Sequence, residues 1–226
     1  MHYTVRDVAK LLNVSERSIY RWINNNSIPA YKIHEQYRFN KMEILEWANL
    51  KKIGISLEML KEVHNPEGET PTLEDTLKSG GIYYRISGND KKSVLMSVVE
   101  NLKLPESVNR EYLLEVLLAR EELSSTGIGE GIAIPHVRNP IIFNIPKSLI
   151  SLCFLEKPID FGSIDDKPVH ALFLMMCATP RIHLGLLSRL SYSLKDEKLK
   201  QAIINQASRE EILTEFRRVE SQLKKL

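Results

Sequence analysis

The feature that most constrains the fold is a polar interruption that divides the chain into two unequal parts. The stretch from His64 to Pro71 (HNPEGETP) contains two prolines and one glycine and has no hydrophobic periodicity. Proline and glycine among polar residues mark breaks between structured segments. Because 226 residues suffice for about one or two domains, we expect domains at residues 1–52 and 72–226. Residues 53–71 then form a linker, in which 53–63 can make a short helix.

Composition excludes several classes of protein. The chain is 43% hydrophobic and 27% charged, as in ordinary globular proteins. With only two cysteines, Cys153 and Cys177, a disulfide scaffold and a cysteine-based zinc site are excluded. No apolar run approaches the roughly 20 residues that span a bilayer, and the N-terminus lacks the apolar core of a signal peptide. We expect a cytoplasmic protein that uses no metal, cofactor or membrane.

Charge is distributed unevenly between the two parts. Residues 1–52 contain nine Lys and Arg against five Asp and Glu, whereas the remainder contains 22 against 24. A basic N-terminal part on a slightly acidic remainder indicates that only the former meets a polyanion. Chance asymmetry between solvated surfaces is the alternative.

Helix-start signals follow one another closely in the N-terminal part. Thr4 can cap a first helix with Asp7 as its capping-box partner, and Ser15 can cap a second. Asn13 between them suits a left-handed turn. The apolar residues recur at helical spacing and predict the buried faces: Val5, Val8, Ala9 and Leu12 in the first helix, and Ile19, Trp22 and Ile23 in the second.

The outward face of the second helix carries Arg17, Ser18 and Arg21. Two arginines and a hydroxyl suit insertion into a DNA major groove, where Arg can bond guanine or phosphate. Residues 28–33 and 36–39 then predict a hairpin, whose Lys32 and Arg38 complete the candidate DNA contacts. Asn40, with Glu43, can cap a third helix with Ile44, Leu45, Trp47 and Ala48 as its buried side.

The run YTVRDVAKLLNVSERSIYRWINNNSIPAYKI…YRFNKMEILEWA resembles the excisionase and MerR-like winged helix-turn-helix family over residues 3–50. This resemblance implies double-stranded DNA as a partner. The chain departs from it at His34-Glu35, where many members have a Gly-Arg wing tip. Because Glu35 would repel phosphates, we expect it to weaken any contact of the wing with DNA. A helical module for protein contacts is the alternative.

From Leu73 the pattern alternates between helices and apolar strand-like runs, which predicts a mixed α/β domain. Residues 94–102 and 112–120 predict amphipathic helices, and 148–154 and 169–176 predict buried strands. The run from Arg120 to His136 contains three glycines but fits neither a dinucleotide fingerprint nor a P-loop. It offers flexible backbone leading to a short strand at 131–134, after which Pro135 can hold His136 at the strand's exposed end.

The segment STGIGEGIAIPH resembles the active-site segment of the fructose/mannitol and nitrogen-type enzyme IIA proteins of the bacterial sugar phosphotransferase system. The resemblance covers residues 72–222 and includes FGSIDDKPVHALFLMM and ATPRIHLGLLSRLSYSL. It implies that His136 accepts a phosphoryl group, that His183 is the second active-centre histidine, and that Arg120 lies near the phosphohistidine. An HPr-like phosphocarrier protein is the implied donor.

Those roles agree with the chemistry of the residues. A neutral imidazole is nucleophilic near physiological pH, and Arg120 can offer a fork to phosphate oxygens. Thr179 and Pro180 can begin a helix that carries His183, and a helix start is an anion site. Val137 replaces the small residue common after the active histidine and can narrow access to it. We expect His170 to be a packed core residue.

These interpretations combine into one hypothesis: a winged helix-turn-helix domain followed by a mixed α/β, enzyme IIA-like phosphoryl-acceptor domain. The predicted function is a bacterial transcriptional regulator controlled by phosphorylation of His136. One alternative is a transport component that passes phosphate to a sugar-specific IIB domain, and another is a non-catalytic module that binds regulatory proteins. The sequence leaves open the sugar or nitrogen signal, the operator, the sign of regulation and whether the chain forms a homo-oligomer.

Overall fold

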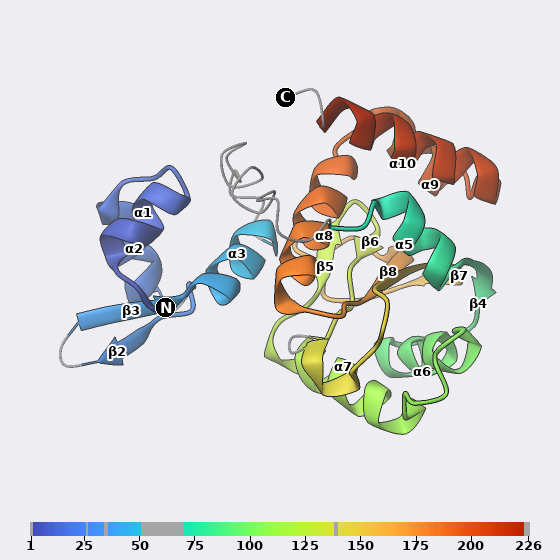
Figure 1. Cartoon of the computed structure of the whole chain (residues 1–226), viewed down its shortest axis with the longest axis horizontal. Coiled ribbons are helices and arrows are strands. Elements are labelled where there is room, and N and C mark those ends of the chain that lie inside the picture. Colours follow the sequence, from blue (N-terminus) through green and yellow to red (C-terminus); the bar gives the residue numbers. More distant parts are fainter. Residues whose placement is uncertain (1, 26, 34–35, 51–69, 138–139, 224–226) are drawn as a thin grey trace. The chain divides into compact units, whose positions relative to one another are not determined.

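The computed structural model describes residues 2–25, 27–33, 36–50, 70–137 and 140–223. The chain forms two compact units, Met1–Glu69 and Thr70–Leu226 (Figure 1). The helix expected at 53–63 and the acidic wing residue Glu35 lie outside the described residues. Among those that are described, no helix is both long and apolar enough to cross a membrane.

The first unit combines helices α1 (Val5–Leu11), α2 (Glu16–Asn24) and α3 (Lys41–Leu50) with a small antiparallel sheet. The sheet has the order β1-β3-β2, with β1 at His2–Tyr3, β2 at Tyr31–Ile33 and β3 at Gln36–Asn40. The hairpin is confirmed. The two-residue strand β1 is too short to show periodicity, and the sequence analysis does not predict it.

Local signals at the helix ends are confirmed. Thr4 and Asp7 form a reciprocal capping box on α1, and the Ser15 side chain accepts a hydrogen bond from the Ser18 amide at the start of α2. Asn13, in the turn between them, has φ 51°. The predicted cap by Asn40 stays a prediction. Glu43, its predicted capping partner, accepts a hydrogen bond from the Tyr31 hydroxyl at 2.8 Å.

The second unit is built on a five-stranded mixed sheet of order β4-β7-β8-β6-β5. The long central strands β7 (Leu149–Ile159) and β8 (Val169–Met176) pair antiparallel and confirm the two predicted buried strands. On their outer sides β4 (Ile82–Ile86) pairs parallel with β7, and β6 (Ile132–Ala133) pairs parallel with β8. The edge strand β5 (Gly127–Gly129) pairs antiparallel with β6.

Helices cover both faces of this sheet (Figure 1). One face packs against α6 (Lys91–Asn101) and α7 (Arg110–Leu123), and the other packs against α5 (Leu73–Gly80), α8 (Pro180–Ser193), α9 (Glu197–Ile204) and α10 (Arg209–Leu223). A 3-10 helix occupies Pro140–Phe143. Both helices predicted before the glycine-rich run are confirmed.

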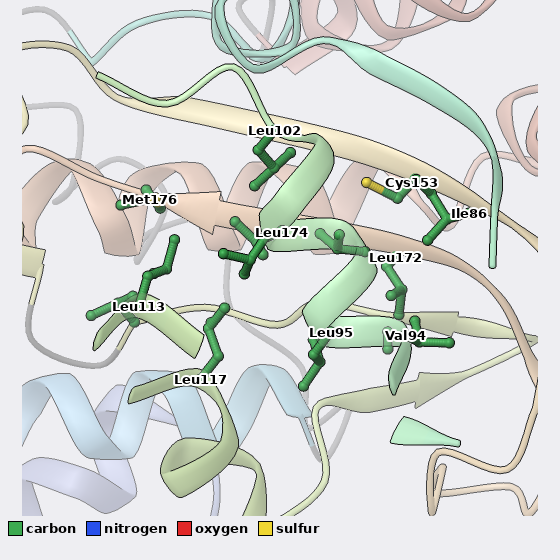
Figure 2. Packing of buried hydrophobic residues seen from close by; sticks show 14 of the residues in the cluster. Ile86, Val94, Leu95, Leu102, Leu113, Leu117, Cys153, Leu172, Leu174 and Met176 are labelled. Carbon is green, nitrogen blue, oxygen red and sulfur yellow. The ribbon is translucent and has the colours of Figure 1, made fainter. Parts of the chain in front are cut away.

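The side-chain alternation along β8 explains the two hydrophobic clusters. Leu172 and Leu174 pack with Leu95, Leu113 and other residues of α6 and α7, as Figure 2 shows. Phe173 belongs to the cluster formed with α5, α8, α9 and α10. Because both faces of the strand are covered, its sequence is apolar at every position from Ala171 to Met176 instead of at alternate ones.

Candidate functional site

A tight β5–β6 hairpin leads the chain to His136. Gly129, Glu130 and Gly131 have φ of 90°, 57° and 75°. A Cβ on Gly131 would lie 2.2 Å from Nδ1 of His170, so no side chain fits there. The Asp165 carboxylate accepts a hydrogen bond from the Glu130 amide at 2.8 Å. The glycines therefore form a packed turn.

His136 continues the sheet beyond β6. The Met175 amide donates to the Pro135 carbonyl at 2.9 Å, and His136 forms an isolated parallel bridge with Met175 of β8. His136 is fully buried. This corrects the expectation of an imidazole at an exposed strand end, because the segment runs on beside the buried strand β8 and does not leave the sheet.

The hydrogen bonding of His136 defines which ring nitrogen can react. Its Nδ1 lies 2.7 Å from the carbonyl oxygen of Ile134. A carbonyl only accepts hydrogen bonds, so Nδ1 carries the proton. In the neutral ring, Nε2 then holds the lone pair and is the nucleophilic atom.

His183 lies beside His136. Thr179 caps α8, its side chain accepts a hydrogen bond from the Ile182 amide, and Pro180 occupies the first turn, all as predicted. This places His183 one turn into the helix, where it is buried. The ring centroids of the two histidines are 5.1 Å apart, with an angle of 50° between the planes.

Arg120 lies in the last turn of α7 and is buried. Its Nη1 donates to the Ser124 carbonyl at 2.9 Å, which ties the end of the helix to the start of the glycine-rich segment. The two histidine rings are in direct contact, and the hydrogen bond to Ser124 connects Arg120 to the segment that carries His136.

Two other sequence expectations need correction. Val137 is 1% exposed and belongs to the cluster beneath α6 and α7, so its side chain points into the core and does not narrow a surface approach to His136. His170 is only half-buried and packs against Gly131 instead of lying in the core. Its partial burial lowers the pKa of the imidazole.

A buried polar cluster that was not predicted from the sequence lies next to Arg120. The Glu121 carboxylate accepts hydrogen bonds from the amide and the hydroxyl of Thr126, and it forms an ion pair with Lys91. A signal was present, because Glu121 continues the i, i+4 series of Leu113 and Leu117 on the buried face of α7. A carboxylate on a core-facing position requires a partner.

The helix-turn-helix unit presents a polar, basic hollow on α2. It is lined by Ser15, Arg17, Ser18, Tyr20, Arg21, Asn24 and Asn25. Arg17 and Arg21 are exposed, while the Ser18 hydroxyl lies 3.0 Å from that of Ser15. The rings of Tyr20 and Tyr37 meet edge to face at 6.4 Å and connect α2 with β3.

The two candidate contacts on the hairpin differ. Lys32 on β2 is exposed. The Arg38 guanidinium donates to the Gln36 side chain and to the Tyr37 carbonyl. Arg38 is therefore held along β3. Within the described ranges no group of three or more His, Cys, Asp and Glu side chains is arranged to hold a metal ion.

Comparisons with known proteins agree with this architecture. Residues 76–219 match the family "Phosphoenolpyruvate-dependent sugar phosphotransferase system, EIIA 2", and residues 3–49 match a helix-turn-helix domain. A nitrogen regulatory protein of Pseudomonas aeruginosa is 35% identical over 123 residues, which are 53% of this chain and 77% of that protein. The fructose-specific EIIABC component of a PTS system in Bacillus subtilis is 33% identical over 145 residues, which are 62% of this chain and 22% of that longer protein.

A solved structure shows the same fold. Nitrogen regulatory protein IIA-Ntr from Neisseria meningitidis superposes with a TM-score of 0.53 at 26% identity, covering 60% of this chain and 91% of that one. The EIIA 2 match includes more than half of the 226 residues and contains His136, His183 and the whole glycine-rich segment. The chain therefore belongs to the EIIA 2 family of the phosphoenolpyruvate-dependent sugar phosphotransferase system and carries a helix-turn-helix domain at its N-terminal side.

Proposed function

We propose that this protein is a DNA-binding transcriptional regulator whose His136 accepts a phosphoryl group from an HPr-like phosphocarrier protein. The observation that carries the proposal is the hydrogen bond from His136 Nδ1 to Ile134, with the His183 ring 5.1 Å away. With the proton on Nδ1, the nucleophilic electron pair of the neutral ring is on Nε2. In the reaction the bond between phosphorus and the carrier's histidine nitrogen breaks, and a bond to Nε2 of His136 forms. Nε2 need not lose a proton first.

The surroundings of His136 supply positive charge. His183 sits in the first turns of α8, where the helix dipole favours an anion. We assign His183 to hydrogen bonding with the phosphoryl oxygens and Arg120 to neutralising their charge. Because His136 is fully buried, its surroundings must open locally before a carrier can reach Nε2.

DNA binding is proposed for the α2 face. Exposed Arg17 and Arg21 flank the polar hollow, and the first 52 residues have an excess of positive charge. A nitrogen regulatory protein among the relatives favours a regulatory role. The fructose-specific EIIABC relative favours a second candidate function, in which His136 passes its phosphoryl group to a sugar-specific IIB domain.

The direct test is phosphorylation of the full chain with phosphoenolpyruvate, enzyme I and a carrier protein, followed by intact mass and site mapping. We expect one phosphoryl group on His136, its loss in His136→Ala and slower labelling in His183→Ala. His2→Asn is the control, because it alters a histidine outside the EIIA 2 match and should leave labelling intact. Undiminished labelling of His136→Ala would contradict the proposal, and rapid transfer to a purified IIB domain would favour the transport role.

A further inference from the structure

We infer that Glu121 is a positioning residue that fixes the tautomer and orientation of His136 through successive hydrogen bonds made by Thr126 and Ile134. The inference rests on the proposed function of His136 as phosphoryl acceptor. Glu121 lies at the end of α7, and its side chain is 3% exposed. Burial at this level makes the carboxylate dependent on its partners.

The chain of contacts is continuous. The Thr126 amide donates to the Glu121 carboxylate at 3.0 and 3.1 Å, and the Thr126 hydroxyl donates to it at 2.6 Å. The Thr126 carbonyl accepts from the Ile134 amide at 3.0 Å. The Ile134 carbonyl accepts from His136 Nδ1 at 2.7 Å. Three successive links thus join the carboxylate to the imidazole.

All of these bonds have the same direction. From His136 to Ile134, from Ile134 to Thr126 and from Thr126 to Glu121, the donor always lies on the histidine side. The N–H and the C=O of Thr126, like those of Ile134, belong to different peptide groups, so these bonds act by holding the backbone in place. Glu121 fixes Thr126, and Thr126 fixes Ile134. The Ile134 carbonyl is thereby held at hydrogen-bonding distance from Nδ1 of His136. The proton stays on Nδ1, and Nε2 remains the basic atom.

Lys91 completes the arrangement at its outer end. Its Nζ lies 3.1 Å from Glu121 and 4.9 Å from the centre of the Phe161 ring, while its side chain is 31% exposed. The cation offsets part of the cost of burying the carboxylate.

The test compares Glu121→Gln with Glu122→Gln in the full-length chain. Both variants exchange a carboxylate for an amide at adjacent positions of α7, but Glu122 is exposed. Nitrogen-15 NMR of the histidine rings reports the tautomer directly, with the His136 signals assigned from their loss in His136→Gln. We expect wild type and Glu122→Gln to hold the proton on Nδ1, and Glu121→Gln to shift it toward a mixture of tautomers.

Phosphorylation by the carrier should follow the tautomer. We expect the carrier to phosphorylate Glu121→Gln about tenfold more slowly than wild type. A loss of this size is at the lower end of what is typical when a group that orients a metal-ligating imidazole is removed. Glu121→Asp, which retains the charge, should recover part of the rate. If Glu121→Gln does not fold, Thr126→Val removes the hydroxyl bond alone and should shift the tautomer less. Identical ring spectra and rates in Glu121→Gln and Glu122→Gln would overturn the inference.

The tautomer measurement needs no phosphoryl donor, so the two proposals fail separately. If the wild-type chain is never labelled but Glu121→Gln still shifts the tautomer, the positioning role stands and the proposed function falls. If the chain is labelled on His136 with no response to Glu121, the function stands and the positioning role falls.

Discussion

The buried carboxylate of Glu220 connects three helices of the second unit. It accepts hydrogen bonds from Arg189 of α8 at 3.3 Å and from the Leu73 amide at the start of α5 at 2.9 Å. Nε and Nη2 of Arg189 are buried and find no hydrogen-bond partner within the described ranges. A buried pair with incomplete hydrogen bonding gains little net stability, yet losing one partner leaves an uncompensated charge.

Single and double substitutions should therefore differ at this pair. Glu220→Leu should lower the free energy of unfolding by about 3 kcal/mol or more, because it leaves the Arg189 cation buried alone. The double variant Arg189→Met/Glu220→Leu should lower the free energy of unfolding by less than Glu220→Leu alone does. Urea titrations of the four proteins in the cycle measure this, and a double variant less stable than either single variant would contradict it.

Glu74 makes stability depend on pH. Hydrogen bonds from Arg217 at 2.5 and 2.8 Å, and then the ion pair with Lys78 at 2.7 Å, lower the pKa of Glu74 from 4.5 to about 2. A carboxyl whose pKa is lower in the folded state stabilises the fold above pH 4.5. That contribution is lost as the pH falls toward 2.

Glu74→Gln should remove this dependence. We expect Glu74→Gln to lower the free energy of unfolding by about 1 kcal/mol at pH 7 and not at all near pH 2. The loss at pH 7 is small because both cations are largely exposed and solvent screens them. Urea titrations between pH 2.5 and 7 measure the difference. The control is Glu106→Gln, at an exposed position. A constant difference from wild type across this range would argue against the ion pairs as its cause.

At the scale of elements, the sequence predicts what local chemistry determines. Thr4, Ser15 and Thr179 cap helices through groups three residues away, and β7 and β8 are recognisable as long apolar runs. The strands β4 and β5 escape prediction because they depend on remote partners. Gly127–Gly129 has little strand preference of its own and becomes β5 only by pairing with β6.

In the candidate site, too, features set by local sequence could be predicted and features set by remote contacts could not. Short motifs single out His136, His183 and Arg120, and the structure brings the two histidines together. The burial of His136 could not be predicted, because it depends on β8, almost forty residues further along the chain. The contact between Glu121 and Thr126 required knowledge of how the chain turns after α7.

The α2 helix is the element on which DNA recognition is predicted to depend. Arg17→Ala and Arg21→Ala should each weaken binding to a selected site, by about 1–3 kcal/mol for a bidentate contact to guanine. Binding should also weaken steeply as salt rises, because contacts to phosphates release counterions. Fluorescence anisotropy with selected and scrambled duplexes measures both effects.

Arg209→Ala is the matched control for this experiment. It removes the same charge from an exposed position on α10 of the second unit. If it weakens binding as much as Arg17→Ala does, overall charge and not the α2 face determines affinity. Failure of genomic selection with the full-length protein to enrich any sequence would contradict a specific operator.

At the scale of the whole molecule, regulation requires that the second unit affect the first. The residues after position 52 contain 22 basic and 24 acidic side chains, so this part is already slightly negative. A phosphoryl group adds about −1.5 to −2 charges at neutral pH. At physiological salt, charges farther apart than about 8–10 Å are largely screened from each other. If His136 lies farther than this from bound DNA, simple repulsion by the added charge is a weak means of control.

Phosphorylation must then change a contact, either between the two units or between copies of the chain. We expect it to change DNA affinity about 5- to 150-fold, which corresponds to about 1–3 kcal/mol of coupling. Titrations of one duplex with phosphorylated and unphosphorylated full-length protein, at fixed salt and protein concentration, measure this. Sedimentation of both forms shows whether assembly changes. His136→Ala treated with the same donor system is the control and should bind DNA as the unphosphorylated protein does. Equal affinities and equal assembly states would mean that the two units share a chain without phosphate-controlled DNA binding.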